Sequence, residues 1–190
     1  MLLKTHTMKL FKTLLLLSIL LTSCSSNDDN SDDKIEINTQ IEITFSGDGI
    51  GTSTFKDLDF GLHQDCAIFT FYANTAFQNE SITVASFIFQ LEELTFNPNE
   101  TYSFDGPAVN DFLYPINLRT EVNSEFYEAT YITTEVTSRF YKEQEFCGEF
   151  YGRVFDINFT VMLEHSSGNL APITITGNTI DLPIEDNCGC

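Results

Sequence analysis

The chain contains no tryptophan and few basic residues, and both absences restrict what it can do. Of its 190 residues, nine are lysine or arginine and 28 are aspartate or glutamate, so the formal net charge is −19. A protein that binds nucleic acid presents the opposite sign of charge, and we exclude that class. Without tryptophan, a carbohydrate site would have to use tyrosine rings. The candidates are Tyr72, Tyr114, Tyr127, Tyr131 and Tyr151.

Histidine and the common catalytic motifs are also scarce. Only three histidines occur, and the G-x-S-x-G motif of many serine hydrolases is absent. We interpret His63 and His165 as exposed turn residues. Acidic pairs could serve as the acid and base of a glycosidase, but 28 acidic residues bring such pairs together by chance. These pairs are Glu92 with Glu93, Glu143 with Glu145, and Asp57 with Asp59. We therefore do not expect an enzyme, and an extracellular hydrolase is an alternative.

No motif indicates a bound cofactor or metal. The D-x-D-x-D-G run of a calcium-binding loop is absent. Aspartates on loop-like sequence could still offer oxygen ligands to Ca²⁺, but solvation of loop acids explains them more simply. They are Asp48, Asp57, Asp59, Asp105 and Asp111.

The chain has no apolar run that could span a membrane as a helix, which needs roughly 20 residues. Its short apolar run covers residues 13–23 and follows three lysines. This layout is typical of a secretory signal peptide. The run ends in Leu21-Thr22-Ser23-Cys24, which resembles the lipobox of bacterial lipoproteins. The resemblance implies that residues 1–23 are removed and that Cys24 carries a lipid anchor in the membrane.

Residues 24–33 follow as the lipidated cysteine and an acidic tether. Ser25 to Asp33 includes four aspartates and no apolar residue, so we expect a solvated, flexible segment. Acidic stretches directly after the lipidated cysteine resemble the surface-export signal of Bacteroidota lipoproteins. The resemblance implies an outer-membrane protein on the cell surface. A domain that faces the periplasm is the alternative.

Four cysteines remain after Cys24, and past the inner membrane they are able to form disulfides. Cys66 with Cys147 is one candidate pair, because each precedes a strand-like segment. Cys188 and Cys190 are too close in the chain to pair without strain, unless the tail is flexible. Either of them could instead pair with the body of the domain, so the connectivity stays open.

Most of the remaining chain alternates apolar and polar residues with the period of a β-strand. The alternation is clearest in residues 35–45 and 153–163. Further strand-like segments cover 66–73, 81–96, 100–106, 125–141, 173–175 and 180–184. We expect a turn at residues 46–49, a bulge near Ala85, and a turn or bulge at Gly177-Asn178. Residues 107–124 show no clear pattern and could hold a short helical turn.

These segments predict an all-β protein: a single antiparallel β-sandwich or barrel-like domain of about eight strands, over residues 34–190. The 18 phenylalanines and seven tyrosines of the chain would mostly fill its core. The patterns G-x-V-F-D-I-N-F at 152–159 and ITITGNTIDLPI at 173–184 resemble the C-terminal part of small β-rich lipoproteins of Flavobacteria and their relatives. The resemblance covers about a third of the chain and implies a lipid-anchored β domain, without an implied activity.

The sequence therefore predicts a lipoprotein whose acidic β domain binds a ligand or completes an envelope assembly. Its partner would be an envelope protein or a glycan. One alternative is an interaction subunit of a glycan-uptake, secretion or motility system, which predicts a contiguous apolar patch. A hydrolase instead predicts a cleft with two carboxylates or a histidine.

Overall fold

The computed structural model describes residues 37–65, 68–92, 97–111, 115–141 and 152–184. All of them belong to one compact unit, Ile35–Cys190. Within these ranges the chain forms strands and turns and no helix, which confirms the predicted all-β class. This part of the chain has no helix that is long and apolar enough to cross a membrane. The predicted signal peptide and tether, residues 1–33, lie outside the described residues.

In the described residues, eleven strands form one antiparallel sheet, so the prediction of about eight strands is wrong in number. The strands are β1 (Gln40–Gly47), β2 (Gly51–Lys56), β3 (Phe60–Asp65), β4 (Ile68–Ala73), β5 (Phe77–Gln78), β6 (Thr83–Glu92), β7 (Thr101–Pro107), β8 (Asn117–Val122), β9 (Glu125–Phe140), β10 (Arg153–His165) and β11 (Ile173–Pro183). The sequence does not predict β2, β3, β5 and β8, because these strands are short or rich in polar residues. It also divides β11 into two strands.

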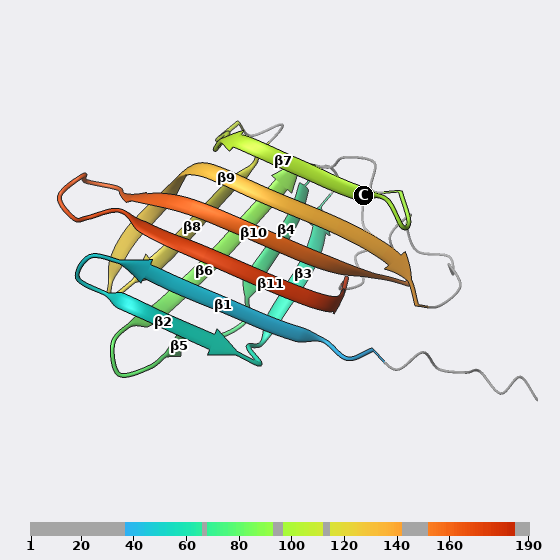
Figure 1. Ribbon diagram of the computed structural model, residues 1–190, viewed down its shortest axis with the longest axis horizontal. Coiled ribbons are helices and arrows are strands. Elements are labelled where there is room, and N and C mark those ends of the chain that lie inside the picture. Colours follow the sequence, from blue (N-terminus) through green and yellow to red (C-terminus); the bar gives the residue numbers. More distant parts are fainter. Residues whose placement is uncertain (1–36, 66–67, 93–96, 112–114, 142–151, 185–190) are drawn as a thin grey trace, which may run out of the picture. The chain divides into compact units, whose positions relative to one another are not determined.

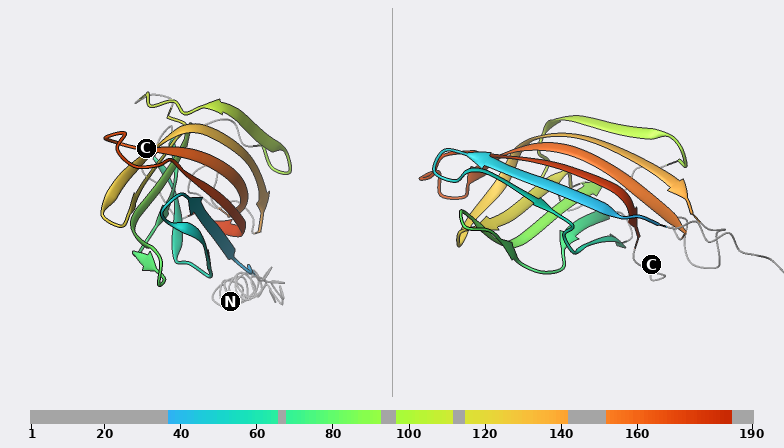
Figure 2. Two further views of the ribbon diagram at one scale, coloured as in Figure 1. Left: turned by 60° about the vertical axis from the view of Figure 1, so that its left-hand side comes forward. Right: turned by 60° about the horizontal axis from the view of Figure 1, so that its bottom comes forward.

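The sheet folds over itself into two layers that face each other (Figure 1). Its strand order is β2-β1-β11-β10-β9-β8-β6-β4-β3, with β7 paired to β9 and β5 paired to β6. The long strand β9 belongs to both layers. Its start, Glu125–Glu128, pairs with β8, whereas Tyr131–Thr137 pairs with β7. Figure 2 shows the curl from two further sides.

An isolated β-bridge connects the two layers where the sheet curls. Leu62 of β3 pairs in parallel with Ile184, directly after β11. The pairing of β1 with β11 begins at Gln40, opposite Ile180, and does not extend to Ile184. Ile184 can therefore pair with β3. The arrangement agrees with the predicted sandwich or barrel-like architecture.

Three register shifts in the described sheet lie where a strand changes the face that it buries; one of them is in β9, which has Thr130 as an extra residue opposite the step from Met162 to Leu163 of β10. In β6 the shift falls between Val84 and Ser86, which confirms the predicted bulge near Ala85. The expected break at Gly177-Asn178 is wrong, because both residues pair regularly with β1 and β10. The shift lies instead opposite Asp156, where β11 contributes two residues against one. Residues 107–124 contain no helix in their described part; they form a bridge between Val109 and Ile116, followed by β8.

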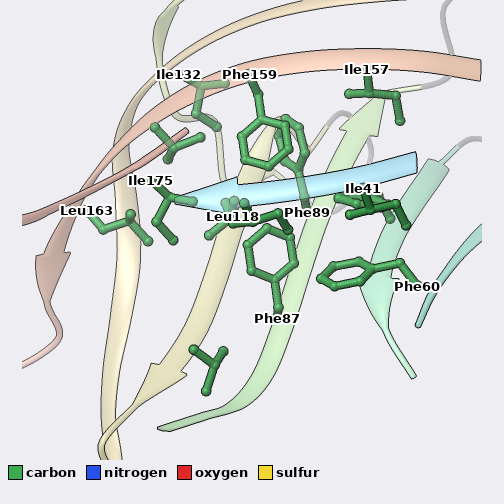
Figure 3. Close-up of a cluster of buried hydrophobic side chains, with 14 of the residues drawn as sticks. Ile41, Phe60, Phe87, Phe89, Leu118, Ile132, Ile157, Phe159, Leu163 and Ile175 are labelled. Atoms are coloured by element: carbon green, nitrogen blue, oxygen red, sulfur yellow. The ribbon is translucent and has the colours of Figure 1, made fainter. Parts of the chain in front are cut away.

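Aromatic and branched side chains fill the space between the layers (Figure 3). Each strand supplies alternate residues, as the period-2 pattern predicts; β1 buries Ile41, Ile43 and Phe45. Phe159 of β10 lies between the layers, with its ring centroid 5.0 Å from that of Phe89. Edge-to-face and tilted ring pairs of this kind add to the stabilisation from burial alone. The interior is therefore a packed core.

The outer face of the layer that contains β2, β1, β11, β10, β9 and β7 is mostly polar, with exposed apolar side chains such as Tyr131 and Met162 among the polar ones. One rank of directly opposed threonines runs across five of these strands and ends at Asp105 of β7. The rank consists of Thr54, Thr44, Thr176, Thr160 and Thr133. Threonine suits this position because its branched side chain favours a strand while its hydroxyl stays hydrated. The hydroxyls of Thr44 and Thr54 also bind each other at 2.8 Å.

Candidate functional site

An open depression of about 270 Å³ lies on the outer face of β3, β4 and β6. Its lining residues are His63, Ile68, Thr70, Tyr72 and Gln90. Three of them form a row across the strands, because Thr70 lies opposite His63 on β3 and opposite Gln90 on β6. The alternate residues of β4, Phe69 and Phe71, point into the core. The same alternation that builds the core thus places this polar set outside.

A glycine lies opposite the tyrosine on the neighbouring strand. Tyr72 lies opposite Gly61 on β3 and opposite Ile88 on β6. Gly61 has no side chain to occupy its position in that row. On the other side, the residue opposite Tyr72 is Ile88 of β6, whose side chain is exposed.

The lining combines apolar surface with hydrogen-bonding groups. Tyr72 and Ile68 offer apolar faces, while imidazole, hydroxyl and amide groups come from the row of His63, Thr70 and Gln90. A ring with apolar faces and several hydroxyls, such as a sugar, matches this mixture. The five lining residues include no carboxylate, so they do not supply the acid and base of a glycosidase.

The interpretation of both histidines as exposed turn residues is wrong. His63 is half-buried within β3, a strand that the sequence does not predict. His165 ends β10, and its side chain is only 9% exposed. The loop after β10 covers it by turning back onto β9, where the backbone N–H and the hydroxyl of Ser166 both donate to the carbonyl oxygen of Phe126 at 2.9 Å.

His165 is held between an acid and a hydroxyl. Its Nε2 lies 2.9 Å from Oε2 of Glu125, and its Nδ1 lies 2.8 Å from Oγ of Ser167. The ring of Tyr127 packs edge-on against the imidazole, with centroids 5.3 Å apart. Burial, and then the nearby Glu125 charge, raise the pKa of Tyr127 above its ordinary value.

The bulge in β11 brings together two aspartates that no local pattern connects. The backbone N–H of Asp181 donates to Oδ1 of Asp156 at 2.8 Å, and Arg139 of β9 forms an ion pair with the Asp181 carboxylate. Burial raises the pKa of Asp156, and the positive charge of Arg139 opposes that rise. Asp181 also has a left-handed backbone, with φ of +55°. We interpret this cluster as a link between β9, β10 and β11.

The predicted loop acids do not gather into one place. Within the described ranges, no three His, Cys, Asp or Glu side chains are arranged to hold a metal ion. Asp59 accepts a hydrogen bond from Nδ2 of Asn74 at 2.9 Å. Asp105 accepts hydrogen bonds from the hydroxyls of Tyr131, at 2.9 Å, and Thr133, at 3.1 Å.

The remaining predicted acids are scattered. Asp48 lies in the turn between β1 and β2, Asp57 between β2 and β3, and Asp111 is exposed after β7. Glu92 ends β6 and is half-buried. Its predicted partner Glu93 lies outside the described residues, as do Glu143 and Glu145.

The five candidate tyrosines have different positions. Tyr72 lines the depression, Tyr131 is exposed on β9, and Tyr127 is buried beside His165. Tyr114 and Tyr151 lie outside the described residues.

An interaction subunit predicts a contiguous apolar patch on the surface of the domain. Among the large exposed apolar side chains of the described surface, only Tyr131 and Met162 lie directly opposite each other.

All five cysteines lie outside the described residues. The predicted lipidation of Cys24 therefore stays a prediction. The same holds for pairing among Cys66, Cys147, Cys188 and Cys190.

Comparison of the chain with protein-family models, with curated proteins and with solved structures finds no match in any of the three. The structure by itself defines the described part of the chain as an aromatic-filled β domain without helices, with an open depression on one outer face. Sequence reasoning names Tyr72 and His63 but does not bring them together. Gly61 and Gln90 give no sequence signal at all, because their role depends on the register of β3, β4 and β6.

Proposed function

We propose that this protein is a lipoprotein anchored by Cys24 to the outer membrane, displayed on the cell surface, and that its β domain binds a neutral glycan. The depression around Tyr72 is the observation that carries the proposal. An aromatic ring that provides an apolar face, with hydroxyl, amide and imidazole groups beside it, is the combination that a sugar requires.

The packing of the domain supports binding on its outside. Phenylalanine side chains from both layers occupy the interior, and Phe45, Phe71, Phe87 and Phe89 are each 1% exposed or less. A ligand inside the curl would have to displace this core. The outer faces are instead mostly polar. The depression is a concave part of this outer surface, and we assign the ligand to it.

The negative charge of the protein favours a neutral glycan over an anionic one. The chain carries a net charge of −19, and none of the five described residues that line the depression is lysine or arginine. An anionic polysaccharide would be repelled by the domain as a whole and would find no cation at the site. A neutral glycan avoids both costs.

The two alternative functions fit the described surface less well. An interaction subunit would use a contiguous apolar patch, but the exposed apolar side chains are mostly dispersed over separate strands. A glycan hydrolase would place two carboxylates in the depression, and the five described residues that line it include none.

Binding of a panel of neutral polysaccharides to the mature protein, measured by calorimetry, tests the proposal. Tyr72→Ala should weaken the Kd of any bound glycan by about tenfold, which corresponds to about 1.4 kcal/mol. Gln90→Ala should weaken it as well. Tyr131→Ala is the matched control, since it removes an exposed tyrosine from the other layer. Failure of the whole panel to bind, or an equal loss in Tyr131→Ala, would contradict the proposal.

A further inference from the structure

The end of β10 and the loop after it form a second arrangement, which the proposed glycan binding does not use. His165 lies between Glu125 at the start of β9 and Ser167 in the loop. The imidazole is almost completely covered, whereas the Glu125 side chain is 52% exposed and Ser167 is exposed. A covered histidine thus connects two groups that solvent can reach.

The hydrogen bonds determine where the proton of the imidazole lies. The backbone N–H of Ser167 approaches Nδ1 of His165 at 3.3 Å, and the Ser167 hydroxyl oxygen lies 2.8 Å from the same nitrogen. A backbone N–H can only donate, so Nδ1 must be the acceptor and the neutral ring carries its proton on Nε2. That proton is donated to Oε2 of Glu125 at 2.9 Å. The Ser167 hydroxyl therefore donates to Nδ1.

Several contacts fix this geometry. Tyr127 packs against one side of the imidazole. Ser166 anchors the loop to the Phe126 carbonyl oxygen through both its N–H and its hydroxyl. The N–H of Gly168 donates to the carbonyl oxygen of His165 at 2.8 Å, and Gly168 has a φ of +70°, which favours glycine. The hydroxyl is thus held in place by a closed turn.

We propose that Ser167 is a nucleophile that accepts a short acyl group from carboxylic esters, with His165 as its general base and Glu125 as the positioning residue. A serine hydroxyl that donates to a histidine, which in turn donates to a carboxylate, has the polarity that nucleophilic catalysis requires. In the familiar Ser-His-Asp triad, Nε2 faces the serine and Nδ1 faces the carboxylate. Here Nδ1 faces Ser167 and Nε2 faces Glu125, but the order of serine, histidine and carboxylate is the same.

The reaction balances with the groups that are present. Oγ of Ser167 attacks the ester carbonyl carbon, and its proton passes to Nδ1 of His165. The bond between the carbonyl carbon and the alkoxy oxygen breaks, and the leaving alcohol takes the proton from Nδ1. Water then attacks the acyl-serine in the same way and releases the carboxylic acid.

The position of Ser167 restricts the substrate. It stands on an exposed loop, and none of the residues that line the depression belongs to this region. Leu170 is the one large exposed apolar side chain of the described loop, which is too little cover for a long acyl chain, so the acyl group that fits is short, such as acetyl. This activity is independent of the proposed glycan binding, because the two places share no residue.

Release of nitrophenolate from p-nitrophenyl acetate by the full-length protein in detergent tests the proposal. Ser167→Ala should lower the rate to that of unspecific acetylation, whereas Ser103→Ala, which removes an exposed serine from β7, should retain the wild-type rate. His165→Gln should lower the serine-dependent rate by about 100-fold or more, the usual contribution of a general base. Glu125→Gln should cause a smaller loss. Mass spectrometry after acid quenching should find the acetyl group on Ser167.

Equal rates for wild type and Ser167→Ala would overturn the proposal and leave the contacts as a purely structural fastening of the loop. Acetyl groups in equal yield on Ser166 and Ser167 would overturn it as well. Circular dichroism shows whether His165→Gln folds. If it does not fold, Glu125→Gln decides, because its exposed side chain can be changed without opening the core.

Discussion

The ring of Phe159 occupies the space in which a side chain at position 177 would lie. The two residues are directly opposite in β10 and β11, and a Cβ atom built on Gly177 would stand 2.0 Å from Cζ of the ring. Glycine is therefore required at position 177 because a side chain has no room there, and not because the backbone has a positive φ. An aromatic ring that covers a glycine on the neighbouring strand also protects the backbone that the glycine leaves bare.

Gly177→Ala should destabilise the domain by about 2–3 kcal/mol, because the Phe159 ring would have to leave its position in a packed core. Urea unfolding followed by circular dichroism measures the loss. Phe159→Ala alone should cost about 3–5 kcal/mol. In that background, Gly177→Ala should cost almost nothing, since the atoms that it would meet are gone. Additive effects of the two substitutions would show that the contact does not matter.

Asp156→Asn should stabilise the protein at neutral pH. Because burial raises the pKa of Asp156 in the folded state, its ionisation costs folding free energy at any pH above the ordinary value of 3.8. Asparagine removes this cost and can still accept the hydrogen bond from the Asp181 N–H. The thermal midpoint should rise by about 2 °C at pH 7, and the gain should disappear below pH 3.8.

Asp181→Asn is the matched control for that experiment, since it makes the same change in the same cluster. It removes the partner of Arg139 and should lower the thermal midpoint at pH 7. A lower midpoint for Asp156→Asn at pH 7 would show that the attraction of Arg139 outweighs burial.

Cys24→Ser should block incorporation of labelled palmitate and leave an unprocessed precursor. The thiol of Cys24 is the group to which the lipid would be attached, and several acyl chains hold a domain on a membrane far more firmly than one. Radiolabelling followed by gel electrophoresis measures both effects. A serine variant that is labelled and cleaved like wild type would show that the chain is not a lipoprotein.

The acidity of the tether should matter more than its length for surface display. Replacing the four aspartates between Ser25 and Asp33 by asparagine keeps the size of the segment and removes four charges. Protease added to intact cells should then digest the wild-type domain and spare the variant, with equal amounts of lipidated protein. Digestion of permeabilised cells is the control. Equal digestion of both proteins in intact cells would show that the aspartates act only as a solvated spacer.

At least one disulfide should form among the four cysteines that follow Cys24. Counting free thiols on the mature domain under denaturing, non-reducing conditions measures it. Fewer than four free thiols would support pairing, and peptide mapping would then identify the partners. Four free thiols would exclude it.

Strands with strict alternation could be predicted from the sequence, and short strands could not. In β1 and β10 the apolar residues of one parity are the buried ones, because a half-exposed strand has to sort its side chains by face. β2 and β8 lack such a run, and they become strands only because β1 and β6 offer them partners. The position of the break in β11 cannot be predicted from the sequence for a related reason. Glycine and asparagine suggest a turn locally, but the ring of Phe159 requires the glycine.

The candidate sites depend even more on long-range pairing. Tyr72 and His63 stand out as residue types, yet only the register of β3, β4 and β6 puts them beside Gln90. Ser167 and His165 are two residues apart, but Glu125 reaches them from 40 residues away. Single-sequence patterns carry no information about such distances, because they report the faces of a strand and not its neighbours.

The pairing of β1 with β11 has a consequence for how the chain matures. Ser46 near the start of the domain bonds to Thr174, 128 residues later. The first strand therefore has no inner neighbour in the sheet until nearly the whole polypeptide is available, and closing so long a loop is slow. A chain threaded through a membrane from its N-terminus could not pair β1 with β11 until its C-terminal part had crossed. If the chain is exported as we propose, its sheet is therefore completed only after translocation.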